Sequence, residues 1–399
     1  MATMTMHASS PTTDQLSWTA RERHLTIGGL LAIGLSFGLA RYGYGLFLPD
    51  IRREFDLSVS TVGVIGSAAY VGYLLALLAV GRLADRAGPR VLVGTGGASA
   101  VLGISLVAVA PNVAVLTVGL VLAGTSPAWS WAPYSDAVEV AVSPAKRERV
   151  LSIVPAGTAV GTAAVGPLAL VASGDAWRWA WGAMAVMAAV AAVYATWTLP
   201  AHGPRRRDSP RSHSAPGISW LVLPAAFPLY LTALAYGVIG SFYWNYATEV
   251  ISATTTSAVA VPAFWTLMGG AGLLGMLAGV VLSRLGLGRS SALLFSTLGL
   301  ALALLGVLPG SIVAAGISAT LYGPAFMVGA SLLAVWSYQV FPGRPTAGFT
   351  ATLLCLGAGT ILGPATLGLL ADHVGLRTAF LLTACLCLVT IAARPRRHP

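Results

Sequence analysis

Apolar, uncharged stretches recur along the whole chain and are separated by short groups of charged residues. A membrane-spanning helix needs about 20 mostly apolar residues, and several stretches have that length. The turn-forming segments APNVA at 110–114 and LPGSI at 308–312 divide the two longest stretches into pairs. The pattern therefore predicts twelve spanning helices, at 25–48, 60–80, 91–110, 113–135, 151–173, 177–199, 218–247, 259–282, 290–309, 311–338, 346–371 and 376–393.

Composition supports an all-α membrane protein. The chain is 56% hydrophobic and only 9% charged, whereas a soluble domain carries about 25% charged residues. Membrane barrel strands would alternate apolar and polar positions over about ten residues, and these stretches do not alternate. A soluble enzyme or binding domain is excluded.

The distribution of charge predicts orientation. If the N-terminus lies inside, 18 of the 23 basic residues fall in inner loops and tails, which follows the positive-inside rule. Both termini are then cytoplasmic, in a plasma or inner membrane. Lipid headgroups account for the net charge of +10, so no nucleic-acid partner is needed. Residues 1–24 lack the order of a cleaved signal peptide and are expected to form a disordered cytoplasmic tail.

The chain repeats itself at an offset of 197 to 199 residues. GRLADRAGPR from Gly81 corresponds to GVVLSRLGLGR from Gly279, and SPAW at 126–129 corresponds to GPAF at 323–326. Two parallel six-helix repeats describe one transporter architecture. We predict an N-terminal bundle at 25–199, a cytoplasmic linker at 200–217, a C-terminal bundle at 218–393 and a cytoplasmic tail at 394–399.

The loop after the second predicted helix carries the pattern G-x-L-A-D-R-x-G-x-R, which resembles the signature loop of the major facilitator superfamily. The first helix, GLARYGYGLFLP, also resembles a poorly characterised bacterial branch of that family with Arg-aromatic-x-Tyr before Leu-Pro. The resemblance implies two pseudo-symmetric six-helix bundles and transport by alternating access. It also implies that the loop is a latch that closes the inner side and opens when the bundles rock. A simple positive-inside loop is the alternative. Gly81 is expected to let two helix ends approach closely, and Gly88 to permit a sharp turn. The latch residues are Gly81, Asp85, Arg86, Gly88, Arg90 and Arg284.

Arg41 lies inside the first predicted helix, where an arginine costs about 2.5–3.5 kcal/mol on insertion scales. It is expected to face a central cavity and bind an anionic group; a snorkelling arginine is the alternative. By resemblance, the first, fourth, seventh and tenth helices line that cavity. Aromatic walls with a few polar atoms suit a small organic ligand, and an interfacial aromatic belt is the alternative. The remaining candidate substrate-binding residues are Tyr44, Trp129, Tyr236, Tyr243, Asn245 and Phe326.

Two further features bear on mechanism. Gly166–Pro167 and Gly363–Pro364 are expected to be helix pivots, since small residues allow close packing and proline can bend a helix. The first pair lies in a segment resembling the family's antiporter motif, although the glycine spacing departs from it. Leu120 stands where related proteins often carry an arginine associated with proton coupling. The candidates for proton coupling are therefore Asp136, Glu139 and Glu249, all at span ends.

The sequence contains no catalytic motif and no metal-ligand spacing. We therefore predict a monomeric secondary transporter, not an enzyme, without a metal or cofactor. It is expected to move a small organic solute, of anionic or aromatic character, as an exporter or antiporter, with protons as a candidate coupling ion. Two alternatives stay open: an uptake permease or facilitator for an organic anion, and a transport-dead membrane sensor or scaffold.

Overall fold

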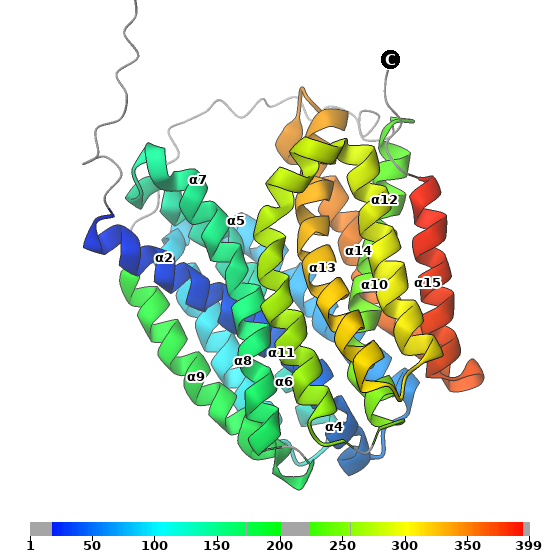
Figure 1. The fold of residues 1–399 in the computed structure, drawn as a ribbon. Coiled ribbons are helices and arrows are strands. Elements are labelled where there is room, and N and C mark those ends of the chain that lie inside the picture. Colours follow the sequence, from blue (N-terminus) through cyan, green and yellow to red (C-terminus); the bar gives the residue numbers. More distant parts are fainter. Residues whose placement is uncertain (1–17, 173, 201–222, 256, 394–399) are drawn as a thin grey trace, which may run out of the picture.

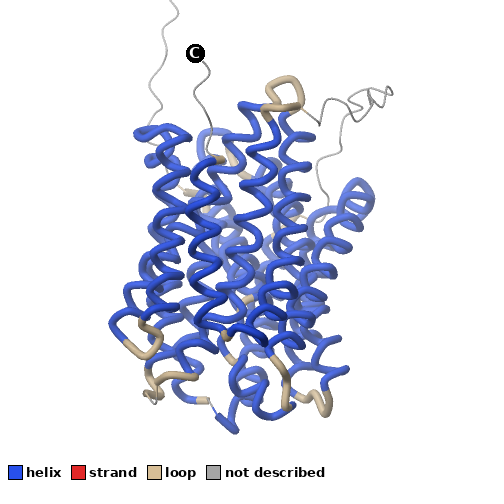
Figure 2. The backbone as a smooth tube through the Cα atoms, turned by 90° about the vertical axis from the view of Figure 1, so that its right-hand side faces the viewer, coloured by secondary structure: helices blue, strands red, loops and turns tan. Residues whose placement is uncertain are grey.

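The computed structural model describes residues 18–172, 174–200, 223–255 and 257–393. In these ranges all regular structure is helical and no strand occurs. The helices run side by side, with loops gathered at the two ends of the bundle (Figure 2). The all-α prediction is confirmed.

The helices fall into two groups, one on each side of the molecule (Figure 1). The N-terminal half contains α2 (Ala20–Ile33), η1 (Gly34–Arg41), α3 (Gly43–Leu46), α4 (Leu48–Phe55), α5 (Val59–Ala108), α6 (Val113–Ala141), α7 (Pro144–Ile153), η2 (Val154–Ala156), α8 (Gly157–Val171), η3 (Gly174–Ala176) and α9 (Trp177–Thr198). The C-terminal half contains α10 (Ala226–Ser252), α11 (Ala260–Gly272), η5 (Leu273–Leu277), α12 (Ala278–Val307), α13 (Ile312–Val340), α14 (Pro345–Val374) and α15 (Leu376–Ala392). The predicted linker at 200–217 and the tail at 394–399 lie almost wholly outside the described residues.

Ten helical segments in the described part of the chain are long and apolar enough to cross a membrane. One of them, Ala260–Val307, is 48 residues long and is interrupted at Gly286, so it provides two crossings. The shorter apolar helix α15 has 17 residues. Together these segments are consistent with the twelve predicted crossings.

The two predicted turns inside the longest apolar stretches are present. The helix α5 ends at Ala108 and α6 begins at Val113, while α12 ends at Val307 and α13 begins at Ile312. Asn112 and Ser311 cap the following helices, because their side-chain oxygens accept hydrogen bonds from backbone N–H groups three residues later.

The first predicted span, 25–48, has the wrong bounds. Its helix begins at Ala20, because Thr19 and Glu22 form a capping box and Glu22 also binds the Lys146 ammonium at 2.9 Å. Residues 20–24 are therefore helical, although we expected them in the tail. At the other end the chain continues as α4 to Phe55. Pro49 lies in the first turn of α4, a separate helix that follows the break at Phe47, and proline fits that position.

The turn after the second crossing depends on Gly88. Its backbone leaves the helical conformation, with φ 69° and ψ 162°, and Gly286 adopts φ 72° and ψ 163° at the equivalent place in the second half. This region is accessible essentially only to glycine. The predicted sharp turn at Gly88 is confirmed, and the repeat at an offset of 198 extends to backbone geometry.

Gly81 differs from Gly88. No described atom lies within 4 Å of the position that a Cβ on Gly81 would occupy. The helix borders open space here, so the close approach of two helix ends at Gly81 stays a prediction for the arrangement in which the terminal end is closed.

These two glycines make a matched pair for mutation. Gly88→Ala is expected to lower the free energy of unfolding by about 1–3 kcal/mol, because alanine must adopt the glycine-only conformation. Gly81→Ala is expected to be neutral or slightly stabilising, since alanine favours a helix and meets no neighbour. Thermal denaturation of the purified protein in detergent compares the two midpoints. Equal midpoints would contradict the role assigned to Gly88.

The two halves meet mainly along two pairs of helices. The first part of α5 packs against α14, and α8 packs against α11. We call the end of the bundle that carries α4 the far end (Figure 1), and the opposite end, where α2 begins and α15 ends, the terminal end. This arrangement positions α3, α5, α6 and α10 around the middle of the interface.

Candidate functional site

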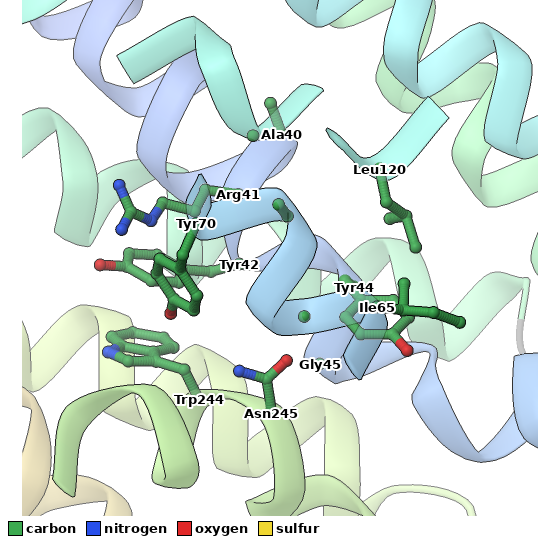
Figure 3. Close-up of a pocket in the computed structure, with 13 residues that line it drawn as sticks. Ala40, Arg41, Tyr42, Tyr44, Gly45, Ile65, Tyr70, Leu120, Trp244 and Asn245 are labelled. Atoms are coloured by element: carbon green, nitrogen blue, oxygen red, sulfur yellow. The ribbon is translucent and has the colours of Figure 1, made fainter. Parts of the chain in front are cut away.

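A small cavity of about 30 Å³ lies between the halves near the middle of the helices. Residues of both halves line it, and Figure 3 draws them as sticks. The segments η1 and α3 together with α5 contribute one wall, α6 a second and α10 the third. Its residues are Ala40, Arg41, Tyr42, Tyr44, Gly45, Ile65, Gly66, Ala69, Tyr70, Leu120, Gly124, Trp244 and Asn245. The expected position of Arg41, Tyr44 and Asn245 at a central cavity agrees with this lining.

The guanidinium of Arg41 rests on aromatic rings. Its Cζ lies 4.5 Å from the ring centre of Tyr70, 4.4 Å from that of Tyr73 and 5.7 Å from that of Phe37. These distances are typical of cation–π contacts, which stabilise a cation without neutralising it. No carboxylate among the described residues forms an ion pair with Arg41. The cavity therefore contains a positive charge that an anionic ligand can pair with.

The rings of Tyr42 and Trp244 stack across the interface. Their centres are 3.9 Å apart and their planes differ by 13°. Trp244 also contacts Tyr322 and Phe326 edge-on, at 5.9 and 5.5 Å. The indole is thus held by rings on three sides, and it joins the N-terminal half to the aromatic core of the C-terminal half.

Asn245 and Tyr44 add polar atoms to the cavity. The amide nitrogen of Asn245 donates a hydrogen bond to the carbonyl oxygen of Ser241 at 2.6 Å, and its amide oxygen lies beside Gly66. The Tyr44 hydroxyl is buried and has no hydrogen-bond partner among the described residues.

Several predicted substrate-binding residues lie away from the cavity. Tyr243 is buried, and its hydroxyl is 2.8 Å from the Ser318 hydroxyl. Tyr236 is buried too, and it donates a hydrogen bond to the carbonyl oxygen of Phe326. Both hydroxyls are therefore used inside the C-terminal half, where the rings form its aromatic core. Their expected place at the cavity is corrected accordingly.

The other two aromatic candidates occupy neighbouring positions. Trp129 packs against α5 beside Gly96 and does not line the cavity. Phe326 is half-buried and touches the cavity only through its contact with Trp244. Leu120 lines the cavity directly, so an apolar side chain stands where the resemblance led us to look for an arginine.

Tyr70, Tyr73 and Trp244 were not among the predicted site residues. Tyr70 and Tyr73 are spaced i, i+3, which places them on one face of a helix. With an unpaired arginine in the preceding span, that spacing is a signal that could have found them.

The halves are fastened together at the far end. The Arg52 guanidinium on α4 forms an ion pair with the Glu249 carboxylate on α10. The backbone N–H of Ser60 donates a hydrogen bond to the Asp372 carboxylate at 3.1 Å. The Tyr246 hydroxyl lies 3.0 Å from a carbonyl oxygen in each half. These contacts close the far end in this arrangement.

The predicted latch residues at the terminal end make few contacts. Arg90 donates a hydrogen bond from Nε to the carbonyl oxygen of Thr196 at 3.1 Å, within its own half. Arg86 and Arg284 are exposed. The side chain of Asp85 lies outside the described residues. A latch that closes the terminal end is expected to be undone while the far end is closed, so the latch stays a prediction.

The two predicted pivots lie at different contacts. A side chain on Gly166 would overlap Thr266 of α11 in the opposite half, whereas one on Gly363 would overlap Ser241 of α10 in the same half. Pro167 and Pro364 lie inside α8 and α14.

Of the proton-coupling candidates, Asp136 and Glu139 are exposed at the terminal end, and only the Glu249 side chain pairs with a residue of the other half. The described residues contain no group of three or more potential metal ligands.

Comparison with known proteins places this geometry in context. The family model described as "Uncharacterised MFS-type transporter YbfB" matches residues 32–394. A gentisate transporter of Corynebacterium glutamicum is 34% identical over 143 residues, which is 34% of this chain and 31% of that protein.

Solved transporter structures share the fold. A bacterial homologue of the human lysosomal transporter Spinster, in an inward-facing and unoccupied conformation, superposes with a TM-score of 0.77 at 14% identity, over 94% of this chain and 97% of that one. A mutant of the peptide transporter POT gives 0.73 at 15% identity, over 93% of each chain. The nucleoside transporter NupG gives 0.70 at 16% identity, over 94% and 98%.

Proposed function

This chain belongs to the major facilitator superfamily of membrane transporters, and from that premise we propose that it carries a small aromatic carboxylate by alternating access. The observation that carries the proposal is the guanidinium of Arg41, which lacks a carboxylate partner among the described residues and lies beside the stacked rings of Tyr42 and Trp244. A cation with adjacent aromatic surface fits a ligand that combines a carboxylate with a ring.

The partial relative supports the same chemistry. Gentisate is an aromatic carboxylate. The C. glutamicum protein named for it aligns with this chain over 31% of its own length. Direction is a separate matter. We retain export or exchange, with cytoplasmic termini, as the prediction from the sequence, and uptake of an organic anion is the competing prediction.

The function is tested by flux. Liposomes that contain the purified protein are loaded on one side with labelled gentisate or 4-hydroxybenzoate, and movement of the label is measured. Protein-free vesicles are the control, and glucose and uridine are tested in place of the carboxylates. We expect saturable flux of the aromatic carboxylates and none of glucose or uridine. Flux of no aromatic carboxylate would refute the proposed substrate class.

Proton coupling is proposed to act through Glu249. Its charge holds the far end closed by pairing with Arg52, so a proton taken up from the far side would weaken that contact. The hydroxyls of Tyr44 and Tyr246 interact electrostatically with both members of this ion pair. Asp372 on α14 in turn interacts with the Tyr246 hydroxyl. Binding of the solute and binding of the proton would then occur at separate places.

Glu249→Gln is expected to remove the acceleration of flux by a pH gradient, because glutamine cannot exchange a proton. Exchange of solute for solute without a gradient is expected to persist. Glu139→Gln is the control, since Glu139 is exposed and makes no ion pair in the described structure. Gradient-driven flux that survives in Glu249→Gln would exclude this residue from coupling.

A further inference from the structure

The indole N–H of Trp244 is a buried donor for which the described part of the chain offers no acceptor. The side chain is 3% exposed, and its Nε1 has no hydrogen-bond partner among the described residues. An indole nitrogen can only donate, and buried donors are paired in the great majority of cases. Trp244 lines the cavity, so a bound ligand can supply the missing acceptor.

Two other donors lie near Trp244 in the close-up of the cavity. Figure 3 shows the Trp244 nitrogen, the Tyr42 hydroxyl and the Arg41 guanidinium on the same side of the cluster. The stack of Tyr42 on Trp244, with ring centres 3.9 Å apart, fixes the indole relative to the chain segment that carries Arg41. The second unpaired donor, the Tyr44 hydroxyl, lies on the opposite side in the same view.

These donors come from different halves of the molecule. Arg41 and Tyr42 belong to the N-terminal half, and Trp244 belongs to α10 of the C-terminal half. A ligand that engages both Arg41 and Trp244 needs a carboxylate for the guanidinium and a second oxygen, separated from it by a rigid spacer, for the indole.

We propose that Trp244 is a specificity-determining residue that donates a hydrogen bond to an oxygen substituent on the ring of the carried carboxylate. The proposal rests on the proposed function and narrows its substrate class to hydroxylated or otherwise oxygen-substituted benzoates. A site built to bond a substrate oxygen rejects an analogue that lacks it, because the donor is then left unpaired in a desolvated place. Unsubstituted benzoate satisfies Arg41 but leaves the indole N–H unpaired.

Competition against labelled 4-hydroxybenzoate or gentisate flux measures the preference. Benzoate, the monohydroxybenzoates and gentisate are compared as inhibitors on the wild-type protein and on Trp244→Phe. The preferred ring position is the one at which a hydroxyl group raises the affinity most. The wild-type protein is expected to bind the benzoate hydroxylated there at least about ten times as tightly as benzoate itself. In Trp244→Phe this ratio is expected to fall to about one to three, and it is this ratio, not the affinity for benzoate alone, that tests the hydrogen bond.

Trp265→Phe is the matched control. This indole lies in the same aromatic cluster, 5.5 Å from the Trp244 ring, but its Nε1 already donates to the Thr248 hydroxyl at 2.8 Å. Its removal is expected to leave the preference for the hydroxylated ligand unchanged. If Trp244→Phe keeps the preference, the proposal is overturned. Water would then be the acceptor of the indole N–H. A preference lost equally in both variants would also overturn it, since general packing would then be the cause.

A comparison on the wild-type protein does not depend on folding of a variant. An aromatic amino group is a poor acceptor, so the aminobenzoate substituted at the preferred position is expected to bind no better than benzoate. Equal binding of the amino and hydroxyl analogues would contradict donation from Trp244. If no benzoate of any kind is carried, the proposed function itself fails, and this result is distinct from a preference that Trp244 does not control.

Discussion

Arg41→Ala is expected to reduce the flux of aromatic carboxylates by about 10- to 100-fold while the protein remains folded in the membrane. A hydrogen bond to a charged group contributes about 1.5–3 kcal/mol, and each 1.4 kcal/mol corresponds to a factor of about ten in affinity. Among the described residues, no other cation lines the central cavity, so no neighbour can replace the lost charge.

Arg41→Lys separates charge from shape. Lysine retains the positive charge but lacks the planar guanidinium that lies over the rings of Tyr70 and Tyr73. We expect partial flux, between that of the wild-type protein and that of Arg41→Ala. Protein levels and the elution volume in detergent are measured for each variant. Full flux in well-folded Arg41→Ala would contradict the role of Arg41 in anion binding.

The second large effect is expected at Gly45. A Cβ at this position would overlap the backbone carbonyl oxygen of Trp244 in the opposite half. A backbone atom cannot rotate away as a side chain can, so Gly45→Ala is expected to keep the halves from closing at this level. Flux is expected to fall at least tenfold, and the protein is expected to favour an arrangement that is open at the far end.

Gly182→Ala is the control for Gly45→Ala, since its added methyl group meets no described atom within 4 Å. The readout is the reactivity of a single cysteine introduced at Ser60 toward a membrane-impermeant thiol reagent, after the three native cysteines have been replaced. Reactivity is expected to rise in Gly45→Ala and to stay at the wild-type level in Gly182→Ala. Unchanged reactivity together with lost flux would indicate misfolding instead of a shifted arrangement.

The apolar runs predicted the helices well because a spanning helix must satisfy its backbone hydrogen bonds within itself and face lipid with apolar side chains. The two turns at 110–114 and 308–312, and the special backbone at Gly88, followed from the same local chemistry. The start and end of the first span did not. Thr19 and Glu22 extend it by capping, and Lys146 stabilises that extension from a segment far along the chain, 124 residues beyond Glu22.

The cavity walls were harder to predict, because a helix that is apolar all round does not reveal which face is turned inward. Tyr243 and Trp244 illustrate the difficulty. Consecutive residues on a helix differ by about 100° in direction, so Tyr243 bonds Ser318 inside its own half while Trp244 reaches Tyr42 in the other. Only the packing of α10 against both halves decides between them.

The absence of a described counter-charge beside Arg41 has an electrical consequence. A carrier whose site holds one uncompensated cation is positively charged there when empty and neutral when it has taken up a monoanion. The membrane potential then acts on the reorientation of the empty carrier, which bears the charge, and has little effect on the reorientation of the loaded carrier. A whole elementary charge crossing 100 mV corresponds to about 2.3 kcal/mol. The membrane potential would therefore change the reorientation rate of the empty carrier more than that of the loaded carrier.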